Sequence, residues 1–119
     1  RITERLLAMK RFCDKRDINF AIVIFPTKEM VFKKQLNQYM LSSMPASMID
    51  LFEAEEGVNT QLKHYFQEKN IAYVDLLPSL SNASDKTKLF FQDANGHMAE
   101  KGHKIAAENI YRAFLLNAE

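Results

Sequence analysis

Three side chains suited to proton transfer lie within five residues in the last third of the chain: Asp93, Asn95 and His97, beside Gly96. Histidine acts as an acid and a base near neutral pH. It does so when a carboxylate or an amide holds its ring in one tautomer while the other nitrogen faces a nucleophile. A short turn that carries Asp and His together can provide this arrangement locally. We therefore interpret His97 as a proton-transfer residue, with Asp93 or Asn95 as the group that orients its ring.

The same residues also have structural interpretations. His97 could be a surface histidine at a helix N-terminus, where the helix dipole disfavours its protonation. Asp93 and Asn95 could be capping residues that accept hydrogen bonds from exposed backbone N–H groups. His97 and His103 are six positions apart, which does not match the i, i+4 spacing of a zinc-binding H-E-x-x-H helix. With the single cysteine, Cys13, this spacing leads us to expect no metal site and no cofactor.

Two further residues are candidates for substrate contact. Lys28 follows Pro26 and Thr27 directly after an apolar run, where its ammonium group could meet an anionic or carbonyl group. Phe91, next to Phe90, could form the wall of an acyl pocket. The structural alternatives are a solvated lysine at the beginning of a helix and phenylalanines of the core.

The elements that must position these residues alternate between helices and strands. Apolar residues at helical spacing predict helices, and short apolar runs that end at a proline predict buried strands. We expect a helix over 1–16, a strand over 18–25, helices over 28–43 and 46–69 with a turn or cap at Gly57, a strand over 71–77, a loop over 79–87 and a helix over 99–116. This order is typical of an α/β domain with a parallel sheet, which binds ligands beyond the carboxyl ends of its strands.

Composition narrows the class of protein. The 119 residues carry 16 Lys and Arg against 15 Asp and Glu, a balance that argues against a nucleic-acid binder. No apolar stretch approaches the roughly 18 to 20 residues that span a bilayer. Two strands are too few for a stable parallel sheet, and the first helix begins at Arg1 without a capping residue. We therefore expect residues 1–119 to form a single α/β domain or the C-terminal fragment of one.

Three segments resemble one family of enzymes. The stretch from Asp93 to His103, followed by Ile105-Ala106-Ala107-Glu108, resembles the last sequence block of the SGNH (GDSL-like) hydrolases, in which Asp and His share a loop before a helix that begins G-H-x-x-A-A-E. Residues 22–31 are similar to the "strand, P-[ST]-K-E-x-V" segment of the branch that includes alginate O-acetyltransferase-like proteins. Residues 71–77, with Asp75, resemble the "gI-x-x-x-D-L" strand of that branch.

The resemblance implies the C-terminal part of a three-layer α/β/α, flavodoxin-like domain that uses Ser-His-Asp chemistry. His97 would be the general base and then the general acid, and Asp93 would orient it and stabilise its charged form. The reaction would be hydrolysis of an ester, or transfer of an acyl group such as acetyl to a sugar hydroxyl. The implied partner is a small-molecule or carbohydrate ester, and the implied location is periplasmic or otherwise extracytoplasmic.

The chain departs from the family pattern in two ways. The family's Asp lies two or three positions before the His, whereas Asp93 lies four before His97 and Asn95 lies two before it. The G-D-S block of the nucleophile and the G-x-N-D block of the oxyanion hole are absent from the sequence. We therefore expect the nucleophilic serine to lie upstream and this chain to be inactive alone. The alternative is a non-catalytic α/β interaction or scaffold domain.

Overall fold

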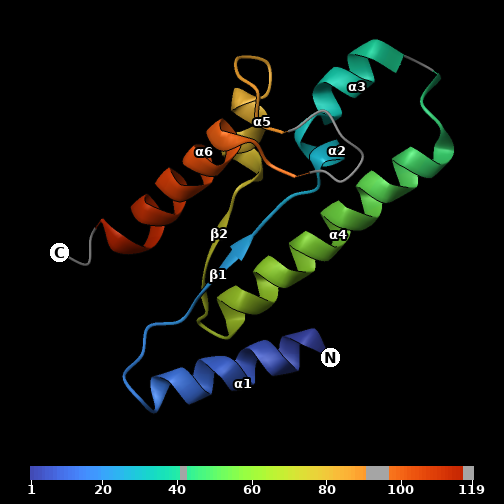
Figure 1. Ribbon diagram of the computed structural model, residues 1–119. Helices are drawn as coiled ribbons and strands as arrows, with labels where there is room; N and C mark the ends of the chain where they lie inside the picture. The colour runs from blue at the N-terminus through green and yellow to red at the C-terminus, as the bar shows by residue number, and fades with distance from the viewer. Residues whose placement is uncertain (41–42, 91–96, 117–119) are drawn as a thin grey trace. The chain divides into compact units, whose positions relative to one another are not determined.

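The computed structural model describes residues 1–40, 43–90 and 97–116, and these residues are mostly helical (Figure 1). They include one small parallel sheet of two neighbouring strands, β1 and β2. None of the described helices is both long enough and apolar enough to cross a bilayer. The elements are α1 (Ile2–Asp14), β1 (Ala21–Ile24), α2 (Lys28–Val31), α3 (Lys33–Met40), α4 (Ala46–Glu68), β2 (Ala72–Asp75), α5 (Leu77–Ala83), α6 (Glu100–Ile110) and the π-helical turn η2 (Tyr111–Leu115).

The chain divides into two compact units. The first contains Arg1–Ile22 and Ser47–Tyr73, and the second contains Val23–Ala46 and Val74–Glu119. The division passes through both strands, so the first half of each strand belongs to the first unit and the second half to the other. The residues with candidate chemistry belong to the second unit.

In the first unit, a hydrogen bond joins α4 to α1, and aromatic packing joins α4 to β2. The Tyr65 hydroxyl donates to the Thr3 carbonyl oxygen at 3.2 Å. Phe66, only 1% exposed, packs against the rings of Tyr65 and Tyr73. Burial of the Phe66 ring removes a large apolar surface from water and so stabilises this unit.

Helices α1 and α4 end in the same way before the two strands. Asp17 and Asn70 adopt positive φ angles of 55° and 56°. The next backbone N–H then reaches back to a carbonyl of the last helical turn: Ile18 to Cys13 at 2.9 Å, and Ile71 to Phe66 at 2.8 Å. Asp and Asn tolerate this left-handed conformation better than other non-glycine residues. Each helix is thus terminated by a local signal directly before an extended segment.

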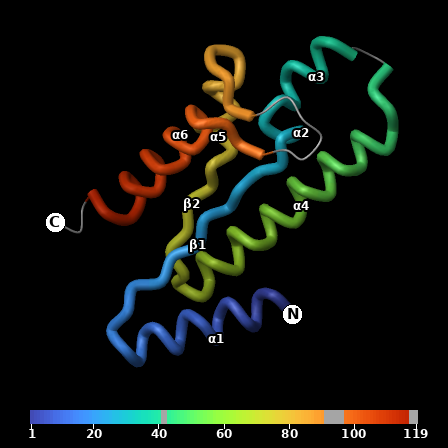
Figure 2. The backbone as a smooth tube through the Cα atoms, in the orientation of Figure 1, coloured from blue at the N-terminus to red at the C-terminus, as the bar shows by residue number. Residues whose placement is uncertain are grey.

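The second unit is built around α5. This helix contacts α2 on one side and α6 on the other (Figure 2). The hydrophobic core of this unit consists of residues with no or almost no exposed surface: Val31, Leu76, Leu80, Leu89, Phe90 and Ala106. The Ser79 hydroxyl lies 2.7 Å from Asn109 Oδ1 and donates to it, which adds a polar link between α5 and α6.

Several sequence-based expectations need correction. The segment 28–43 forms two helices, α2 and α3, divided at Phe32, and Gly57 does not interrupt α4. The expected loop over 79–87 is helical through Ala83. The reason is that Pro78 fits the first turn of a helix, and the Asp75 carboxylate accepts the Leu77 N–H at 2.9 Å, so α5 begins immediately after β2.

The two strands are shorter than predicted, and the final helix changes to a π-helical turn after Ile110. The described residues therefore form a mixed α/β structure with a two-stranded parallel sheet. They do not confirm a three-layer flavodoxin-like fold.

Candidate functional site

The carboxyl ends of the two strands lie side by side. The Leu76 N–H, directly after β2, donates to the carbonyl oxygen of Ile24, the last residue of β1, at 3.1 Å. Beyond β1, the Thr27 hydroxyl accepts the Met30 N–H at 3.3 Å and caps α2, so Lys28 is the first residue of that helix. Lys28 therefore lies beyond the carboxyl end of a parallel strand, where open α/β sheets bind their ligands.

A cavity of about 340 Å³ opens beside Lys28. The Lys28 ammonium group lies 5.9 Å from the centroid of the Phe90 ring, and Phe32 packs edge-on against the same ring at 5.8 Å. We call this cavity the Lys28 pocket; its lining residues are Lys28, Phe32, Ser84, Thr87, Lys88, Leu89 and Phe90. The pocket combines two ammonium groups with aromatic surface, a combination suited to a ligand with a carbonyl or anionic group and an apolar part.

Thr87 is a polar residue in the lining of this pocket. Its hydroxyl oxygen is buried and has no hydrogen-bond partner among the described residues. A buried hydroxyl without a partner is unfavourable by about 1–3 kcal/mol. This oxygen has almost no accessible surface, so the structure does not present it to a ligand in the pocket.

The residues on the two sides of 91–96 are held together. Phe90 and Met98 form an isolated antiparallel bridge, and the Ala99 N–H donates to the Leu89 carbonyl oxygen at 2.7 Å. A Cβ atom on Gly102 would overlap that same oxygen, so the first turn of α6 can approach Leu89 only because residue 102 is glycine. Gly102 therefore serves close packing of α6 against the backbone of Leu89.

The structure locates two of the five predicted site residues. Lys28 lies against Phe90, and His97 lies directly before Met98, the bridge partner of Phe90. The His97 side chain is exposed, and no described side chain hydrogen-bonds to its ring. The other three predicted residues, Phe91, Asp93 and Asn95, lie outside the described residues. The orienting partner of His97 therefore stays a prediction.

Sequence reasoning missed several residues of the Lys28 pocket. Phe32 could have been found, because it follows Lys28 by four positions and such pairs share one face of a helix. Thr87 and Lys88 carry no comparable local signal. They belong to the pocket because the chain after α5 folds back toward α2, which is a tertiary contact.

No group of three or more His, Cys, Asp or Glu side chains within the described ranges is arranged to hold a metal ion.

Comparison with protein-family models, with curated proteins and with solved structures found no match for this chain.

Proposed function

We propose that this chain supplies the acid–base histidine of an SGNH-type esterase or O-acyltransferase, whose nucleophilic serine lies upstream. The sequence block from Asp93 to Glu108 is the basis of the proposal. The observation that carries it furthest is the position of Phe90. The Phe90 ring contacts Lys28, and the Phe90 backbone pairs with Met98, the residue after His97. The same residue therefore contributes to the Lys28 pocket and contacts the backbone next to His97.

The proposed reaction has two halves. In the first, His97 accepts the proton of the serine hydroxyl as its oxygen attacks the ester carbonyl, and then donates that proton to the departing alcohol. In the second, His97 accepts a proton from water or from a sugar hydroxyl, which attacks the acyl-serine. The carbonyl–serine bond then breaks and His97 returns the proton to the serine oxygen.

Asp93 is proposed to orient the imidazole and to stabilise its charged form. Asn95, two positions before His97, is the alternative; an amide could fix the tautomer but would not stabilise the imidazolium by charge. The Asp93→Asn and Asn95→Ala variants distinguish the two roles, because only loss of the true partner lowers kcat strongly.

The Lys28 pocket is proposed to hold the acyl group or the carbonyl end of the substrate. Lys28 would contact the carbonyl or a nearby anionic group, and Phe90 with Phe91 would contact the apolar part. The substrate class is then a small-molecule or carbohydrate ester, and an extracytoplasmic location follows from the resembled branch.

A covalent serine-hydrolase probe tests this proposal directly. A fluorophosphonate should label the longer protein that includes the upstream region, and pre-incubation with an ester substrate should reduce labelling. The same probe should leave the 119-residue chain unlabelled, because the chain lacks a serine in a G-D-S context. Strong labelling of the 119-residue chain, or none of the longer protein, would contradict the proposal.

One observation favours a second candidate, a non-catalytic interaction or scaffold domain. The His97 ring is exposed and has no hydrogen-bonding side chain among the described residues. An upstream sequence without a serine after a hydrophobic strand would support this candidate and remove the first.

A further inference from the structure

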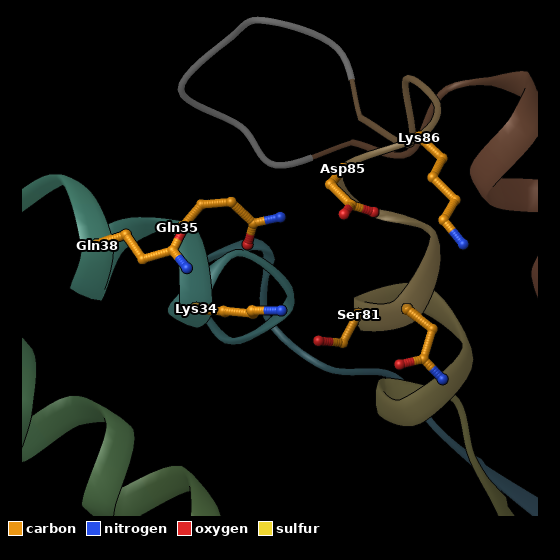
Figure 3. A pocket seen from close by; sticks show the side chains of 7 residues that line it. Lys34, Gln35, Gln38, Ser81, Asp85 and Lys86 are labelled. Carbon is orange, nitrogen blue, oxygen red and sulfur yellow. The ribbon is translucent and has the colours of Figure 1, made fainter.

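A second cavity, of about 330 Å³, lies between α3 and α5. Figure 3 shows Lys34 and Gln35 extending from α3 toward the wall that carries Ser81 and Asp85. Asn82 and Lys86 line the cavity beside them, and Gln38 lies one helical turn after Lys34. We call this cavity the α3–α5 cleft. Its volume is at the lower end of small-molecule sites, which measure about 300–1,000 Å³.

Hydrogen bonds beside the cleft fix which atom of the Gln35 carboxamide faces Ser84. The Ser84 hydroxyl donates to the Ser81 carbonyl oxygen at 2.7 Å, so its own oxygen is left to accept from Gln35 Nε2, also at 2.7 Å. The Gln35 carboxamide is therefore oriented with its nitrogen toward Ser84. Its oxygen, Oε1, is buried and lacks a partner in the described part of the chain.

The chemistry of the lining discriminates among ligand classes. All the lining residues carry polar side chains, so the cleft offers hydrogen-bonding groups rather than the apolar side chains that a lipid or an aromatic ligand would need. A bound anion would meet the Asp85 carboxylate, and Lys86 extends away from the α3 wall rather than converging with Lys34 (Figure 3). The amide, hydroxyl and carboxylate groups of the cleft instead present hydrogen-bond donors and acceptors side by side. The hydroxyl groups of a ligand can pair with donors and with acceptors, because each hydroxyl both donates and accepts hydrogen bonds.

We propose that the α3–α5 cleft binds a neutral polyhydroxylated ligand, the pyranose ring of a sugar. Asp85 accepts hydrogen bonds from two neighbouring hydroxyls, while Gln38 and Lys34 donate to ring or hydroxyl oxygens. This binding is independent of the acid–base role of His97, because no residue of the cleft takes part in that reaction. The hydrogen bond between Gln35 and Ser84 links the cleft to the lining of the Lys28 pocket.

Backbone amide chemical shifts of the 119-residue chain, recorded during titration, test the proposal. The probes are glucose, galactose and N-acetylglucosamine, each to tens of millimolar, with the corresponding trisaccharides in a parallel arm. At least one sugar should shift residues of α3 and of 81–86 saturably. Tighter binding of a trisaccharide would identify a glycan chain as the source, and equal binding would identify a free sugar.

Matched variants make the test specific. Asp85→Asn and Gln38→Ala should each weaken binding about tenfold, because a charged acceptor or a ligand contact is lost. Asp50→Asn, an exposed carboxylate of the other unit, should leave binding unchanged. Failure of every sugar to bind would overturn the proposal, as would saturable binding of inorganic phosphate or of glycine at these residues without any sugar binding.

Discussion

At the residue scale, Phe90 is the anchor of the candidate site. Its ring supports the Lys28 ammonium group and the Phe32 ring, and its backbone pairs with Met98 beside His97. The residue type and position of Lys28, or of His97, are compatible both with a role in the reaction and with a simple surface residue. Phe90 contacts Lys28, and its bridge partner Met98 follows His97, so substitutions at these positions test the proposed roles.

His97→Ala should lower ester turnover by the longer protein by about 10²–10⁴-fold, the usual contribution of a general acid–base residue. The matched control is His103→Ala, because His103 is also exposed and lies within the first turn and a half of α6. Steady-state kinetics on both variants provides the measurement. Equal activity of the His97 variant and the wild type would contradict the proposed role.

Lys28→Met should raise KM about tenfold and change kcat little, because the substitution keeps the aliphatic length but removes the charge that would contact a carbonyl or anionic group. Lys69→Met is a matched control, since the Lys69 ammonium lies 6.0 Å from the Tyr65 ring in the other unit. A comparable rise of KM in both variants would show a general charge effect and not substrate contact.

At the scale of elements, the position of α6 depends on a single missing methyl group. Gly102 faces the Leu89 carbonyl oxygen so closely that any Cβ atom forces the backbone to shift. The same oxygen accepts the Ala99 N–H, so the start of α6 is hydrogen-bonded to the residue that Gly102 contacts. Gly57, in the middle of α4, has no atom within 4 Å of the corresponding position.

We therefore expect alanine substitution at the two glycines to change the free energy of unfolding in opposite directions. Gly102→Ala should lower the free energy of unfolding by about 1–3 kcal/mol through overpacking. Gly57→Ala should raise it by about 0.5–1 kcal/mol, because alanine loses less conformational entropy in a helix. Urea denaturation of the 119-residue chain measures both. A neutral Gly102 variant would mean that α6 can move away from Leu89 without loss.

At the scale of the whole molecule, stability of the second unit depends on the core around α5. Leu80 has no exposed surface, whereas Leu51 on α4 is 68% exposed. Leu80→Ala should lower the free energy of unfolding by about 2–5 kcal/mol through the cavity that it leaves. Leu51→Ala should change it by less than about 0.5 kcal/mol. Equal effects in denaturant titrations would contradict the assignment of this core.

Much of the local structure was predictable from the sequence because its causes are local. The apolar spacing of α1, α4 and α6 and the apolar runs of β1 and β2 depend only on neighbours along the chain. The predicted α5 region was wrong because Ser, Asn and Asp suggested a loop. The hydrogen bond from the Leu77 N–H to the Asp75 carboxylate and the fit of Pro78 in the first turn favour a helix instead.

By itself, the sequence predicted the helical stretches of α1, α4 and α6, the extended runs of β1 and β2, and that Lys28 follows a strand. It did not predict the division between α2 and α3 or the helix α5. Only the tertiary structure decided that Thr87, Lys88 and Phe32 share a pocket with Lys28, and that Gly102 lies against Leu89. The physical reason is the distance along the chain over which each kind of interaction acts. Helix periodicity and capping act over a few residues, whereas a cavity wall or a close backbone contact depends on segments that the chain brings together from far apart.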